Sequence, residues 1–149
     1  MRRALVVLSA LILNASLLER AWAAQACAWI VESVEDDGAH MFKLNLSVDA
    51  PRSLAVRFQG PGFTSASMGG VMIQLAPGEP KEVDGEGFDV SAGDDLHFDV
   101  QLFDHPLASL DEMRDPTGKP LAAFAFHTKV GQNERASPGG LAKQCKNLG

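Results

Sequence analysis

A nine-residue stretch, His40–Val48 with the sequence HMFKLNLSV, decides the fold of this chain. From position 42 onward, Phe, Leu, Leu and Val occupy the even-numbered positions, and Lys, Asn and Ser lie between them. Side chains of a β-strand point alternately to its two faces, so this period of two predicts a strand with one buried face. A second stretch, Leu96–Leu102 with the sequence LHFDVQL, shows the same alternation. The chain therefore contains at least two half-buried strands.

Shorter alternating segments surround these two and are separated by turn sequences rich in Gly, Pro and Asp. We expect further strands at residues 27–32, 54–58, 71–75, 81–83, 88–90 and 121–130. The connection at 104–120 is longer and contains one predicted helical turn, at 107–113. About seven short strands without a substantial helix are typical of an all-β fold, and we predict an antiparallel immunoglobulin-like β-sandwich with one disulfide. A small barrel is the alternative architecture.

The first 23 residues have the organisation of a secretory signal peptide. A basic pair at Arg2–Arg3 precedes an apolar run at Ala4–Leu18, and the small residues of Ala21–Ala23 follow. This apolar run is too short for a membrane span, and the small residues form a cleavage site. We expect a β-sandwich domain at 24–130 and a C-terminal tail at 131–149. The protein is thus predicted to be periplasmic or secreted, without a membrane span.

Cys27 and Cys145 are the only cysteines of the chain. Two cysteines in an exported protein predict a single disulfide, because the compartment is oxidising. The bridge would tether the tail through Cys145 and would place it beside the first strand. The two cysteines lack the C-x-x-C spacing of redox and metal motifs, so we interpret the pair as structural.

The charge of the chain is unevenly distributed. Residues 24–130 contain 17 acidic and seven basic side chains, whereas the tail has a small basic excess. An acidic surface repels phosphate backbones, so we expect no nucleic acid among the partners.

Motifs that carry catalytic chemistry are missing. The segment at 62–67, GFTSAS, lacks the G-x-S-x-G pattern of an exposed nucleophilic serine. The acidic pairs Asp36–Asp37 and Asp94–Asp95 lie in turn sequences, where Asp supports the backbone geometry. We therefore predict neither an enzyme nor a resident cofactor.

A copper site is the main alternative, because imidazole and thioether groups suit copper. Its candidate ligands are His40, Met41, His97 and His105, with Met68 and Met72 as further thioethers. The spacing argues against such a site, since no His-x-His or Met-x-x-Met pair is present.

The connection at 60–70, GPGFTSASMGG, has no charged side chain and is the candidate binding loop. Phe63 and Met68 are its candidate binding residues. The alternative is that the loop folds over the end of the core. Edge strands could also accept an extended peptide, but acidic residues along an edge discourage such pairing, and the sequence leaves both readings open.

Three segments carry a resemblance to a known family: Phe42–Val48, the turn Ala76–Pro80 and the strand Phe98–Asp104. The chain also has a predicted signal peptide and a single predicted sandwich. On these grounds, residues 27–130 resemble the small periplasmic immunoglobulin-like inhibitors of curli amyloid formation, the CsgC/CsgH family. The long connection, the C-terminal tail and the absence of a C-x-C pair depart from that family. The resemblance implies a periplasmic protein partner whose premature assembly this chain prevents.

We therefore expect an exported, non-enzymatic binding or chaperone-like accessory protein that restrains the assembly of a secreted amyloid or fibre subunit. Its partner would be a protein of the cell envelope or a secreted subunit. A periplasmic copper-binding protein and a small structural subunit of an envelope complex are the alternatives.

Overall fold

The structure is a computed structural model that describes residues 24–61, 63–64, 70–88, 90–91, 93–130 and 142–149. The predicted signal peptide lies outside the described residues, as do Met68 and most of the predicted tail. No helix in the described part of the chain is long and apolar enough to cross a membrane.

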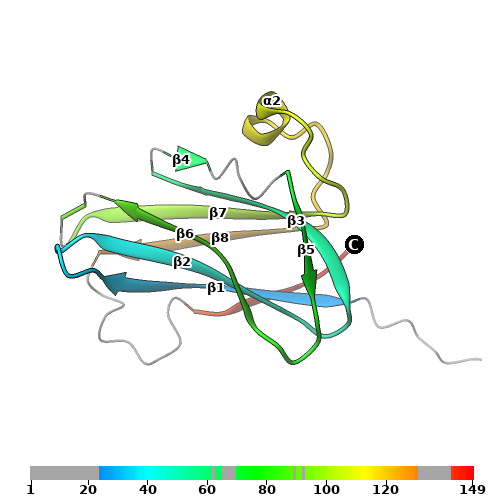
Figure 1. The fold of residues 1–149 in the computed structure, drawn as a ribbon, viewed down its shortest axis with the longest axis horizontal. Helices are drawn as coiled ribbons and strands as arrows, with labels where there is room; N and C mark the ends of the chain where they lie inside the picture. Colours follow the sequence, from blue (N-terminus) through cyan, green and yellow to red (C-terminus); the bar gives the residue numbers. More distant parts are fainter. Residues whose placement is uncertain (1–23, 62, 65–69, 89, 92, 131–141) are drawn as a thin grey trace, which may run out of the picture.

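Two antiparallel sheets pack face to face in two layers (Figure 1). Sheet A has the strand order β6-β2-β1-β9. Its strands are β1 (Gln25–Val34), β2 (His40–Val48), β6 (Lys81–Phe88) and β9 (Gln144–Asn147).

Sheet B is built around β3, which pairs with β7, and β7 pairs with β8. The short strands β4 and β5 pair with the two ends of β3. The elements of this half are β3 (Arg52–Gly60), β4 (Phe63–Thr64), β5 (Met72–Leu75), β7 (Asp95–Phe103), β8 (Ala122–Lys129) and the helix α2 (Leu110–Arg114).

The predicted all-β antiparallel sandwich is confirmed, with three differences in detail. The segments expected as two short strands at 81–83 and 88–90 form a single strand, β6, ending at Phe88. The glycines and acids of this segment favour turns, but pairing with β2 keeps the backbone extended. The two-residue β4 and the tail strand β9 were not expected. The predicted helical turn is present as α2, and Ser109 caps it by accepting a hydrogen bond from the Glu112 amide.

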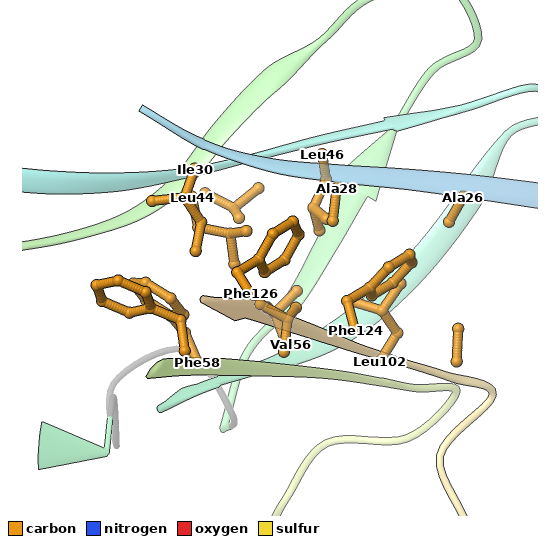
Figure 2. Close-up of a cluster of buried hydrophobic side chains, with 14 of the residues drawn as sticks. Ala26, Ala28, Ile30, Leu44, Leu46, Val56, Phe58, Leu102, Phe124 and Phe126 are labelled. Atoms are coloured by element: carbon orange, nitrogen blue, oxygen red, sulfur yellow. The ribbon is translucent and has the colours of Figure 1, made fainter. Parts of the chain in front are cut away.

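The core lies between the sheets and consists of the alternating apolar positions that the sequence predicts. Figure 2 shows alanine, isoleucine and leucine side chains of β1 and β2 facing valine, leucine and phenylalanine side chains of β3, β7 and β8. Phe98 is fully buried at the centre of this core. Its ring centroid lies 5.1 Å from that of Phe42 and 5.7 Å from that of Phe58. Each buried side chain of this size stabilises the fold by about 1.5–3 kcal/mol, so the core supplies the main driving force.

The predicted disulfide is present. Cys27 and Cys145 are joined, and they are directly opposed in the ladder between β1 and β9. The Leu148 amide extends this pairing by donating to the Ala24 carbonyl, and the Leu148 side chain is buried in the core. The predicted tether of the tail is therefore a strand of the sheet as well as a covalent link.

Strand β9 also covers the outer edge of β8. Gln144 Nε2 donates a hydrogen bond of 2.7 Å to the Ala125 carbonyl, and Lys146 Nζ donates to the Ala123 carbonyl. These carbonyls lie on the side of β8 that faces away from β7. An edge strand usually presents such groups to other chains, so β9 removes part of that liability.

A second, smaller cluster lies on the outer face of sheet B, where the connection between β7 and β8 folds back over the strands (Figure 1). Leu107 packs there with Ala55 and Phe103, and Met72 and Met113 contact the cluster. Buried Arg57 fastens this connection to the sheet, because its Nε and Nη2 atoms donate to the main-chain carbonyls at the end of α2, at 2.6 and 2.8 Å.

Candidate functional site

The outer face of sheet B, at the end away from α2, gathers polar side chains on two neighbouring strands. In β7 the alternation that buries Leu96 and Phe98 points Asp95, His97 and Asp99 outward. The alternation in β8 leaves the side chain of His127 exposed. We call the outward residues Asp95, His97, Asp99, His127 and Lys129 the histidine face.

His97 and His127 are directly opposed in the ladder between β7 and β8. The carbonyls of Ala123 and Ala125 accept hydrogen bonds from side chains of β9, so they point away from β7. The odd-numbered residues of β8 therefore form the non-hydrogen-bonded pairs with β7. Side chains approach each other most closely at such pairs. Accordingly, the two imidazole rings stack, with centroids 4.3 Å apart and an interplanar angle of 8°.

Asp95 lies beside this stack. Its Oδ1 atom is 3.4 Å from His127 Nε2 and 3.9 Å from Lys129 Nζ. All three side chains are at least half exposed, and such ion pairs contribute about 0–1 kcal/mol to stability. The arrangement is therefore of little importance to folding, and its polar groups are accessible to a ligand or partner.

A hollow of about 320 Å³ adjoins the histidine face. It is lined by Gln59 and Gly60 at the end of β3, by Pro61 directly after that strand, and by Asp95, His97 and Asp99 from β7. The lining combines two carboxylates, an imidazole and an amide, which can accept hydrogen bonds from cationic or amide groups. None of these described lining residues carries a hydroxyl or thiol nucleophile.

The hollow lies where the predicted binding loop begins. Phe63 pairs with Gly60 through the main chain in the short ladder between β3 and β4. The position of the Phe63 side chain lies outside the described structure, as does Met68. The structure therefore brings the start of the predicted binding loop beside the histidine face, and the roles of Phe63 and Met68 stay predictions.

The predicted copper ligands are distributed over different parts of the fold. His40 points toward the interior of the sandwich, with Nδ1 2.9 Å from Oε1 of buried Glu32. Met41 is the next residue of β2, so its side chain points to the opposite face of the sheet. His97 lies on the outer face of sheet B, and His105 lies in the connection after β7.

Among the described residues, no group of three or more His, Cys, Asp or Glu side chains is placed to hold a metal ion. Met72, a further candidate, packs against the small apolar cluster under α2. His105 instead pairs with Asp104 at 2.8 Å, and this hydrogen bond lowers the pKa of the Asp104 carboxyl.

The sequence reasoning missed the partnership of His97 with His127. Both residues occupy predicted outward positions, which was the available signal, but the residues between β7 and β8 conceal the register. The buried role of Arg57 was also missed, because an arginine between apolar strand residues normally indicates an exposed position.

No protein-family model matches this chain, and comparison with curated proteins and with solved structures also finds no match. The resemblance to the CsgC/CsgH family thus remains a prediction from the sequence patterns.

Proposed function

We propose that the mature chain is an exported, non-enzymatic binding protein of chaperone-like character. Its partner in this proposal is an aggregation-prone secreted subunit whose assembly into fibres it restrains. The observation that carries the proposal is the hollow between β3 and β7, beside the start of the predicted binding loop.

The chemistry of the hollow favours binding over hydrolysis. Its described lining offers the acceptor groups of Asp95, Asp99 and Gln59 without an adjacent hydroxyl or thiol. An extended segment of a partner that carries Lys, Arg or amide side chains would find hydrogen-bonding groups here. All lining residues of the hollow except Pro61 belong to β3 and β7, whose inner faces contribute to the core, so these strands fix the positions of their backbones before binding.

The sheet edges support a role beside an aggregation-prone partner. A chaperone for such a subunit must avoid becoming part of the growing fibre, which extends by strand addition at edges. Two side chains of β9 donate hydrogen bonds to the carbonyls of β8 that point away from β7. Strand β6, at the other edge of sheet A, has acidic residues in its sequence and a shift in register opposite Leu44 and Asn45. Charges and bulges on edge strands discourage the addition of further strands.

Assembly kinetics test this proposal. The disulfide-bonded mature protein is added, below equimolar amounts, to a curli-type amyloid subunit diluted from denaturant, and fibre growth is followed by thioflavin T fluorescence. We expect a longer lag phase and no incorporation of the protein into the fibres.

A matched pair of variants locates the activity. Asp99→Asn removes a charge from the hollow and should shorten the lag phase relative to wild type. Asp36→Asn makes the same chemical change in the exposed hairpin between β1 and β2 and should act like wild type. An unchanged lag phase even at equimolar wild-type protein would contradict the proposal, and equal losses in both variants would exclude the hollow as the binding surface.

A further inference from the structure

The stacked pair of His97 and His127 has a geometry that the proposed function does not require. The two imidazoles extend from directly opposed positions on adjacent strands, where their Cβ atoms are separated by about 4.5–5.5 Å. Both residues are exposed, so their rings can rotate without disturbing the core beneath them. The rings are stacked nearly parallel, so both must rotate about their side-chain bonds before a nitrogen of each is directed at a common point.

Neutral imidazole is the commonest protein ligand of transition metals, and it suits zinc, copper and nickel ions. Metal-bound histidines usually give their second ring nitrogen to a carboxylate, which fixes the orientation of the ring. Asp95 lies near that position, because its Oδ1 atom is at an ion-pair distance of 3.4 Å from His127 Nε2. That contact leaves Nδ1 of His127 as the nitrogen available to a metal ion.

We propose that His97 and His127 form a binding site for one divalent transition-metal ion of the zinc type, with Asp95 as a positioning residue. The two imidazoles are the protein ligands, and water occupies the remaining coordination positions. The site has only two protein ligands, because no group of three or more His, Cys, Asp or Glu side chains among the described residues is placed to hold a metal ion. The adjoining hollow, which His97 and Asp99 help to line, gives solvent access to the open positions.

This site differs from the copper site that the sequence offered as an alternative, because it pairs His97 with His127, which is not among the candidate copper ligands. It is also independent of the proposed chaperone function, since the binding of an ion needs no protein partner. A zinc-type ion with open positions could accept a side chain of a partner as a further ligand.

The test is a calorimetric titration of the disulfide-bonded mature protein with zinc chloride near neutral pH. We expect one ion per chain, and a loss of affinity of about tenfold or more in both His97→Ala and His127→Ala, since even the loss of an outer-shell partner weakens metal sites by 10–100-fold. His105→Ala is the matched control, because His105 is also exposed and also pairs with a carboxylate, Asp104. It should leave the affinity unchanged.

The role of Asp95 has a spectroscopic test. In Asp95→Asn, the ring-nitrogen chemical shifts of His127 should report a changed tautomer balance, and the zinc affinity should fall less than in the histidine variants. Circular dichroism should show that every variant keeps the strand content of wild type. The absence of zinc binding, or wild-type affinity in His97→Ala, would overturn the proposal, and so would an equal loss in His105→Ala.

Discussion

Removal of the disulfide should lower the free energy of unfolding substantially, because the bridge joins the first strand of the sandwich, β1, to the last, β9. Cys27 and Cys145 are 118 residues apart in the sequence. For a loop of this length, the loss of unfolded-state entropy corresponds to about 5 kcal/mol in the chain-entropy model. Measured losses for native disulfides are about 2–5 kcal/mol, so we expect a decrease of about 3–5 kcal/mol in Cys27→Ser/Cys145→Ser.

The folded state of this variant should keep the strand content of wild type. The pairing of β9 with β1 does not depend on the sulfur atoms, and the buried side chain of Leu148 still anchors the tail. Burial of a leucine contributes about 1.5–3 kcal/mol, which opposes undocking of the tail when the bridge is absent. Amides of β9 should therefore exchange hydrogen faster in the variant, while those of β2 and β7 change only with global stability.

Urea denaturation of the oxidised wild type and the double variant measures the effect. An unchanged slope with a lower midpoint would show that stability, and not the extent of unfolding, has changed. A difference below about 1 kcal/mol would refute the reasoning, since the unfolded chain would then gain little freedom from loss of the bridge.

Three further predictions test the packing and the electrostatics. Phe98→Ala removes the central ring of the core and should destabilise the protein by about 3–5 kcal/mol in urea denaturation, whereas His97→Ala, which faces outward on the same strand, should change stability by less than about 0.5 kcal/mol. Arg57→Met leaves the two carbonyls at the end of α2 without their donor and should lower the free energy of unfolding by about 2–4 kcal/mol. Hydrogen exchange should become faster in the 104–120 connection and stay unchanged in the strands of sheet B. His105→Ala removes the hydrogen bond that lowers the pKa of Asp104, so an NMR titration should show this pKa rising toward its ordinary value. Because the pKa is lowered in the folded state, the associated stabilisation is fully present above the ordinary pKa of Asp and is lost as the pH falls through the lowered pKa of the folded state. An unchanged pKa in the variant would contradict this assignment.

The parts of the fold that the sequence predicts well are those in which side-chain alternation and burial coincide. β2 and β7 have an apolar residue at every second position, and those positions face the core. β6 was predicted less well, because Gly85 and Gly87 interrupt its pattern and its extended form depends on the ladder with β2. β9 has no alternating pattern, and its position follows from the bridge at Cys145.

The same distinction applies to the candidate site. The disulfide could be predicted because only one pairing of two cysteines exists. The stack of His97 and His127 could not, since it depends on the register between strands that a long connection separates. The two imidazoles are neighbours only because Phe98 and Phe126 are paired in the core below them.

The central claim is that the outer face of sheet B binds an aggregation-prone protein partner. The most direct measurement is amide chemical-shift mapping of isotope-labelled protein comprising residues 24–149 on addition of a soluble, unassembled curli-type subunit. The account predicts shifts concentrated at Gln59, Gly60, His97 and Asp99, with little change on the outer face of sheet A. The absence of shifts at equimolar subunit, or shifts confined to sheet A, would contradict it.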